Sequence, residues 1–166
     1  MRTARDMRVQ RFWADGEYAK LSDVGGGLFL SGDYFTTADL EDRGITGVIS
    51  VARECPNARL EYANGLRRAH FGFRDHVIMD QGMVEAAVST VRAFLRHGKV
   101  LVHCGVGISR SPTIIALYRM AMGEEKTYKG AIAHLKKKRP VVRPNKVVDD
   151  GVIQTVEILR RKWAED

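Results

Sequence analysis

The fold of this chain is decided by the stretch Lys99-Val100-Leu101-Val102-His103-Cys104-Gly105-Val106-Gly107-Ile108-Ser109-Arg110-Ser111-Pro112-Thr113-Ile114-Ile115. Its apolar start, residues 99–102, predicts a short buried strand. Residues 112–118 predict a helix, because proline is tolerated in the first helical turn and an apolar run follows it. The sequence therefore predicts a strand, a loop and a helix in direct succession.

The loop has the composition of an anion-binding turn. Gly105 and Gly107 can adopt backbone angles that other residues avoid. In such a loop successive N–H groups can point inward, and the positive end of the following helix faces the same place. Arg110, separated from Cys104 by five residues, adds a planar guanidinium that holds two oxygens of one anion. The loop therefore predicts a phosphate site that needs no metal.

Cys104 is the predicted nucleophile of this site. The positive field of the loop favours its thiolate form. Ser111 follows the arginine directly, so its hydroxyl can donate to the sulfur and help it leave in a second step. The competing interpretation is a buried structural cysteine. We favour the catalytic role of Cys104, because histidine, cysteine, glycine, arginine and serine occur together at a fixed spacing in residues 103–111.

Residues 103–111 resemble the signature of the cysteine-dependent protein tyrosine phosphatase superfamily, and residues 25–160 resemble its dual-specificity branch. The resemblance is also carried by Leu28–Gly32, Leu40–Val51, Glu54-Cys55-Pro56-Asn57, Lys138–Asn145 and Gln154. The chain departs from the family at Ala116-Leu117-Tyr118-Arg119-Met120, where an Ala-Tyr-Leu-Met run is usual. That departure is a packing change that leaves the chemistry untouched.

The resemblance implies an enzyme that removes phosphate from phosphotyrosine and from phosphoserine or phosphothreonine in proteins. It does so through a phosphocysteine intermediate, without cofactor or metal. The implied catalytic residues are Cys104, Arg110, Asp75 and Ser111, with His103 in support. The implied phosphate-binding residues are Gly105, Val106, Gly107, Ile108, Ser109 and Arg110.

The proton for the departing oxygen is expected from a carboxyl group. The family takes it from an aspartate upstream of the signature, and Phe71-Gly72-Phe73-Arg74-Asp75 matches that strand-then-aspartate pattern. Asp80 is the alternative donor. A third reading assigns the role to neither, since loop aspartates are usually only solvated.

A phosphorylated protein is the favoured substrate. The segments that build a deep pocket for phosphotyrosine alone are not found, so a shallower site is expected to admit phosphoserine and phosphothreonine as well. An RNA 5′-phosphatase stays open because the chain is basic, and a phospholipid phosphatase is less favoured because Gly105, Val106 and Ile108 carry no charge. The non-catalytic alternative is a pseudophosphatase that only binds phosphorylated partners. A rhodanese-like sulfurtransferase would need neither His103 nor Arg110. The oligomeric state is left open.

Composition favours one compact catalytic domain at residues 25–166, preceded by a lead-in segment at 1–24 that is flexible or docked. The 166 residues, 45% of them hydrophobic, suffice for a core without disulfides. No membrane association is expected. The expected location is cytoplasmic, with the nucleus as an alternative.

The net charge of +7 is concentrated in residues 126–146, which hold eight lysines or arginines and no acid. The default interpretation is a solvated helix face. Attraction of acidic substrates comes second, and nuclear targeting or nucleic-acid contact comes last.

Cys55 is most simply a structural thiol before Pro56. Some relatives protect an oxidised catalytic cysteine through a second thiol near this place. That resemblance gives Cys55 a redox role as a hypothesis.

Alternating patterns predict an α/β fold, with a central mixed, mostly parallel sheet and helices on both faces. Strands are expected at 28–31, 46–51, 69–73 and 99–102. Helices are expected at 36–44, 84–95, 110–122, 127–138 and 146–163.

Overall fold

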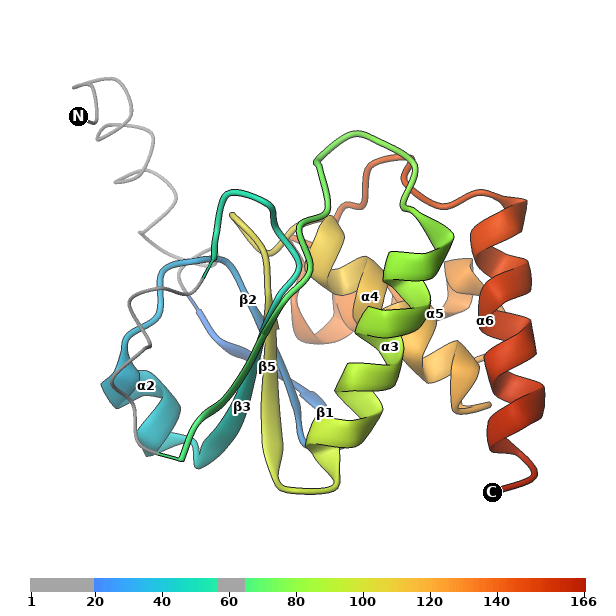
Figure 1. Cartoon of the computed structure of the whole chain (residues 1–166). Coiled ribbons are helices and arrows are strands. Elements are labelled where there is room, and N and C mark those ends of the chain that lie inside the picture. The colour runs from blue at the N-terminus through green and yellow to red at the C-terminus, as the bar shows by residue number, and fades with distance from the viewer. Residues whose placement is uncertain (1–19, 57–64) are drawn as a thin grey trace.

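The computed structural model describes residues 20–56 and 65–166, and Figure 1 shows their arrangement. The strands are β1 (Ser22–Gly25), β2 (Leu28–Ser31), β3 (Ile45–Ser50), β4 (Arg67–His70) and β5 (Lys99–His103). The helices are α2 (Thr37–Asp42), α3 (Gln81–Leu95), α4 (Arg110–Ala121), α5 (Tyr128–Lys138) and α6 (Asp150–Trp163). The expectations for residues 1–19 lie outside the described residues.

The sheet is mixed and mostly parallel, as predicted, with the strand order β1-β2-β5-β3-β4. Only the β1–β2 pair is antiparallel among the described strands. His103 at the end of β5 is in register with Ser31 of β2 and Ser50 of β3. Three parallel strands therefore end at one edge, which is where ligands bind in open α/β sheets.

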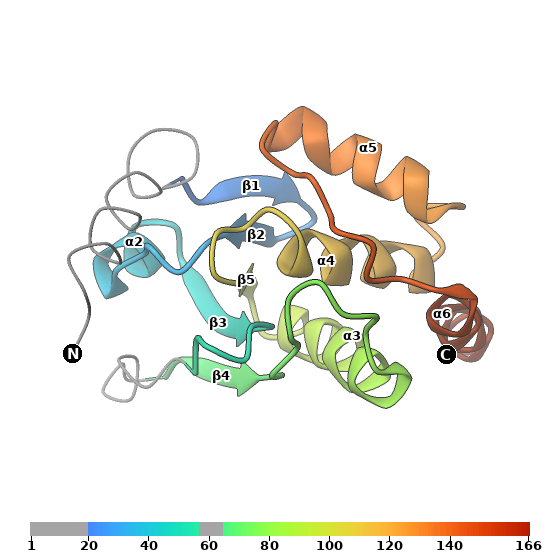
Figure 2. The same cartoon turned by 90° about the horizontal axis from the view of Figure 1, so that it is seen from above.

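The two faces of the sheet are covered unequally. In Figure 1, α2 lies on one side and the other helices lie on the opposite side. Figure 2 shows α4 between α3 and α5, with α6 beside them. Every residue of α4 except Arg119 is buried, because this helix lies between α3 and α5. Within the described parts of the chain, no helix has the length and apolar character needed to cross a membrane.

Some element boundaries differ from the sequence prediction. Residues 22–24, which we expected to be irregular, belong to edge strand β1. Helix α6 begins at Asp150 rather than near 146, because the Asp149 carboxylate accepts from the Val152 N–H at 2.9 Å and caps it there. Strand β4 ends at His70, before the expected 73. The division into a lead-in and a catalytic domain stays a prediction.

Candidate active site

The loop between β5 and α4 is held from outside by its carbonyl groups. The carbonyl oxygens of four successive residues accept hydrogen bonds, from Asp33 N at 2.9 Å (Gly105), Arg139 Nη2 at 3.2 Å (Val106), Arg139 Nε at 2.9 Å (Gly107) and Arg143 N at 2.9 Å (Ile108). Among the described residues, no acceptor takes the N–H groups of residues 105–109. The scaffold thus fixes the loop and leaves its amides as donors for an anion.

Glycine is required where this loop packs against the end of β2. Gly107 has φ +71°, in the left-handed region. A Cβ at Gly107 would lie 2.5 Å from the carbonyl carbon of Ser31, and one at Gly32 would lie 2.8 Å from the carbonyl oxygen of Gly105. Larger residues at either position would displace the loop.

Cys104 and Ser111 meet at the base of the loop. Cys104 is 2% exposed, and its Sγ lies 3.2 Å from the Ser111 Oγ. Ser111 is fully buried in the first turn of α4, so the helix fixes its hydroxyl beside the sulfur. The structure brings together the two residues that the sequence proposed as nucleophile and leaving-group donor.

Arg110 turns into the site and is 4% exposed. Its Nη1 donates to Glu54 Oε2 at 2.8 Å and to the Phe73 carbonyl at 3.0 Å, and its Nη2 also donates to Glu54. Burial disfavours the charged guanidinium, but the hydrogen bonds to Glu54 and the charges of Cys104 and Asp75 outweigh it and raise the pKa of Arg110. The edge formed by Nε and Nη2 keeps N–H groups that no described residue accepts.

Glu54 is a site residue whose role sequence reasoning missed. It follows β3, whose carboxyl end lies beside that of β5, so the sheet brings it to the arginine. Its hydrogen bond to Arg110 lowers the pKa of the Glu54 carboxyl, although partial burial opposes this. The sequence does carry a signal for this role, because Glu54 is an acidic residue shortly after a predicted strand, and the carboxyl ends of parallel strands lie at the same edge of a sheet.

Asp75 stands in the site, whereas Asp80 is used elsewhere. Asp75 Oδ2 lies 3.8 Å from Arg110 Nη2, and its Oδ1 accepts from Asn145 Nδ2 at 3.0 Å. The Asp80 carboxylate caps α3 by accepting from Met83 N at 2.9 Å. The geometry favours Asp75 as the proton donor, and its role stays a prediction.

Residues 139–145 form hydrogen bonds with the loop and with Asp75. Besides the loop carbonyls, the Arg139 guanidinium binds the Lys20 carbonyl at 2.7 Å. Asn145 N donates to Ser109 Oγ at 2.8 Å, so Asn145 joins the loop to Asp75. The default interpretation of residues 126–146 as a solvated helix face includes Arg139. That was wrong for this residue, which is 1% exposed because α5 ends at Lys138 and the arginine turns inward.

Replacing Arg139 by lysine is expected to lower the free energy of unfolding by about 2–4 kcal/mol, because one ammonium cannot replace a buried guanidinium that donates to three carbonyls. Urea denaturation measures the effect. The matched control is Arg143→Lys, whose exposed side chain predicts a change within about 0.5 kcal/mol. Equal stability of both variants would contradict the supporting role of Arg139.

His103 is fully buried beneath the loop. Its Nδ1 lies 3.4 Å from the Cys104 carbonyl and 3.7 Å from Asp33 Oδ1, and the Phe35 ring packs edge-on against it. These contacts fit the supporting position predicted for it. Across the described residues, no group of three or more His, Cys, Asp or Glu side chains is arranged to hold a metal ion.

Cys55 is buried and carries a free thiol, as does Cys104. Burial raises the pKa of Cys55 to about 12, with the charges of Asp33 and Glu54 adding to the effect. Since the thiolate is the attacking species in disulfide formation, this environment predicts slow reaction with an oxidised Cys104. The redox role stays a prediction.

A buried free cysteine near an arginine and unpaired loop amides, at the carboxyl edge of a parallel sheet, is the arrangement expected of a cysteine-dependent phosphatase. Residues 28–153 match the family model described as "Dual specificity phosphatase, catalytic domain". The chain belongs to this family and is an enzyme of the dual-specificity protein phosphatase class, as the resemblance implied.

Known relatives agree in sequence and in fold. Human dual specificity protein phosphatase 14 is 28% identical over 150 residues, which cover 85% of this chain and 71% of that protein. A mouse putative dual specificity phosphatase, solved in complex with zinc tungstate, is similar with a TM-score of 0.70 at 24% identity, covering 92% of each chain. Human DUSP28 gives a TM-score of 0.68 at 23% identity, covering 87% of this chain and 99% of that one.

Proposed function

We propose that this protein hydrolyses phosphomonoesters on tyrosine and on serine or threonine of phosphorylated proteins, through a phosphocysteine at Cys104. One observation carries the proposal. Cys104, Ser111 and Arg110 converge at a loop whose carbonyls at 105–108 are all bound by the scaffold, which frees its amides for phosphate.

Phosphate binding uses the loop and the arginine together. The N–H groups of residues 105–109 surround the phosphoryl oxygens. Glu54 holds the Nη1–Nη2 edge of Arg110, so the Nε–Nη2 edge is presented to the phosphate. These donors are in place before reaction, so they stabilise charge spread over the three equatorial oxygens in the transition state.

In the first step the Cys104 thiolate attacks phosphorus in line with the departing oxygen. The S–P bond forms, the P–O bond to the substrate breaks, and Asp75 gives its proton to that oxygen.

In the second step water attacks the phosphocysteine. Asp75 accepts the water proton, the S–P bond breaks, and inorganic phosphate is released. Ser111 stabilises the departing sulfur through its hydroxyl, which lies 3.2 Å away.

Substrate class is tested by comparing initial rates on four substrates: a phosphotyrosyl peptide, a phosphothreonyl peptide, 5′-phosphorylated RNA and an aryl phosphate. We expect turnover of both peptides and of the aryl phosphate, blocked by vanadate and unaffected by chelators. Preference for RNA over both peptides would overturn the protein-substrate proposal. Binding of phosphopeptides with no turnover of any substrate would support the pseudophosphatase.

Replacing Asp75 by asparagine is expected to lower kcat on a phosphopeptide about 100-fold, because the departing oxygen loses its proton donor. Asp80→Asn is the matched control, and it should keep activity within about twofold because asparagine caps a helix as well as aspartate. The assignment fails if Asp80→Asn, and not Asp75→Asn, causes this loss of kcat on the phosphopeptide.

A further inference from the structure

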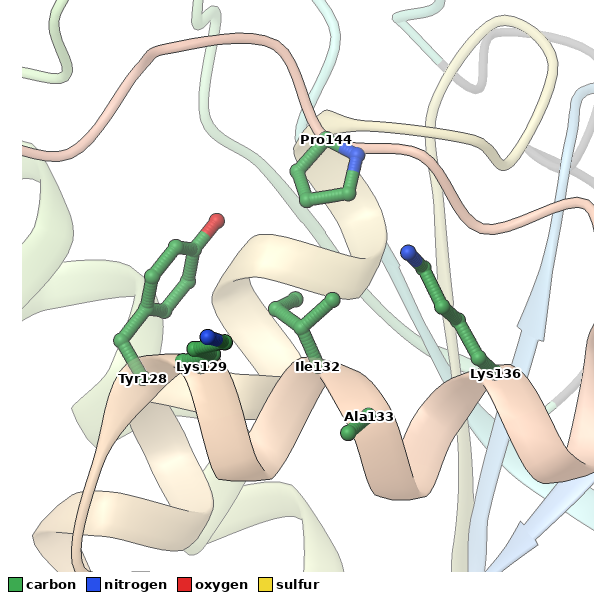
Figure 3. A pocket seen from close by; sticks show the side chains of 6 residues that line it. All are labelled: Tyr128, Lys129, Ile132, Ala133, Lys136 and Pro144. Carbon is green, nitrogen blue, oxygen red and sulfur yellow. The ribbon is translucent and has the colours of Figure 1, made fainter.

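A hollow of about 300 Å³ lies on α5, outside the phosphate site. It is lined by Tyr128, Lys129, Ile132, Ala133, Lys136 and Pro144. Figure 3 shows Ile132 pointing up toward Pro144, with Tyr128 and Lys136 on either side of it along the helix. The Tyr128 hydroxyl lies 3.0 Å from Thr113 Oγ1, which fixes its ring. We call this hollow the α5 groove. It has an apolar floor and a lysine toward each end.

The surroundings of the α5 groove are positively charged. Seven of the eight lysines and arginines in residues 126–146 are exposed, Arg139 being the exception, and this range contains no acid. Among the described residues, no carboxylate pairs with Lys129 or Lys136. The apolar floor and the two ammonium groups together suit an apolar side chain set among acidic residues.

The groove adjoins the catalytic loop through its upper wall. Pro144 stands between Arg143, whose N–H binds the Ile108 carbonyl at 2.9 Å, and Asn145, whose N–H binds Ser109 Oγ at 2.8 Å. The wall of the groove is therefore bonded on both sides to the loop that holds phosphate. A polypeptide leaving the phosphate site in this direction would pass over the groove.

We propose that the α5 groove binds an apolar side chain within an acidic segment of the phosphoprotein substrate and so selects substrates, which rests on the proposed function. The chain's own first residues do not suit it, because Arg2, Arg5, Arg8 and Arg11 would meet lysines. Tyr128 is the one aromatic residue of the lining and stands at one end, whereas the floor at Ile132 and Ala133 is aliphatic and suits an aliphatic side chain.

The test uses two fluorescent peptides as ligands for the full-length protein. One carries Glu-Glu-Leu-Glu without phosphate, and the other has serine in place of leucine. Binding is measured by fluorescence anisotropy at about 0.15 M salt, where the Debye length is about 8 Å. The groove variant is Lys129→Glu with Lys136→Glu. The matched control is Lys137→Glu with Lys138→Glu, which makes the same charge change on exposed positions of α5 outside the groove.

We expect the leucine peptide to bind about tenfold more tightly than the serine peptide, since this factor corresponds to the roughly 1.4 kcal/mol gained by burying an aliphatic side chain. The groove variant should weaken the leucine peptide about tenfold and the control variant less than about twofold. With the leucine sequence placed beside a phosphotyrosine, the groove variant should raise KM and leave kcat unchanged. Aryl phosphate turnover should be unchanged in both variants.

If the groove and control variants weaken binding of the leucine peptide equally, the proposal is overturned, because the effect would then be general electrostatic attraction to the basic helix. Equal binding of the two peptides would also overturn it. Sensitivity of 5′-phosphorylated RNA or of anionic phospholipid vesicles to the groove variant alone, with peptide binding unchanged, would assign the groove to a different occupant. If wild-type protein fails to hydrolyse aryl phosphate, the phosphatase proposal fails, while direct binding of the unphosphorylated peptides still decides the groove.

Discussion

Replacing Cys104 by serine is expected to abolish turnover and to leave phosphate binding in place. A serine hydroxyl at this position is a much weaker nucleophile than a thiolate, and it has no base beside it to ionise it. The loop amides and the Arg110 guanidinium are untouched by this change. We expect kcat to fall by at least about 10⁴-fold, equivalent to about 5.5 kcal/mol of activation free energy.

Steady-state hydrolysis of an aryl phosphate measures the loss, and calorimetric titration with inorganic phosphate measures the retained binding. Cys55→Ser is the matched control, because Cys55 is the other buried free thiol and is tied to neither Ser111 nor the loop amides. It should keep kcat within about twofold, since it takes no part in the chemical steps. Turnover by Cys104→Ser within about tenfold of wild type would refute the covalent mechanism.

Replacing Arg110 by lysine is expected to lower kcat/KM by about 10³-fold although the positive charge is kept. The guanidinium donates to Glu54 with one edge and presents the other edge to phosphate, whereas an ammonium is a point charge without this geometry. The loss removes a preorganised pair of donors from the transition state. The variant also leaves the Glu54 carboxylate without its bidentate partner.

Initial rates with an aryl phosphate give this value directly. Arg143→Lys serves as the control, because Arg143 contacts the loop through its backbone N–H and exposes its side chain. It should keep kcat/KM within about twofold, since no side-chain contact to the loop is lost. An Arg110→Lys variant as active as the Arg143→Lys control would show that charge alone suffices.

The sequence predicted the central part of the fold because its signals are local. Residues 99–102 are an apolar run before a glycine loop, and they form the buried strand β5. Strand β1 was missed because Ser22-Asp23-Val24-Gly25 has no strand pattern of its own; it is defined by pairing with β2. Such an edge strand is set by tertiary contacts, which single-sequence patterns do not record.

The site residues likewise fall into those predicted by a local motif and those placed by long-range contacts. Cys104, Arg110 and Ser111 are contiguous in one motif, so spacing alone placed them. Glu54 and Arg139 reach the loop from distant segments, and their long-range contacts with Arg110 and with the carbonyls of 106 and 107 depend on how the sheet and α5 pack. A readable signal did exist for Asp80, because an aspartate just before a helical pattern is a cap. That signal distinguishes Asp80, which caps α3, from Asp75.

The most direct test of the account is detection of the phosphocysteine itself. Ser111→Ala removes the hydroxyl that lies 3.2 Å from the Cys104 sulfur, so the second step should slow and the intermediate should accumulate. The variant is mixed with an aryl phosphate, quenched in acid within one turnover, digested and analysed by mass spectrometry. The account predicts one phosphoryl group on the peptide that contains Cys104, appearing with a burst of phenol. A burst with phosphate on another residue, or turnover with no phosphorylated Cys104 at any time, would contradict it.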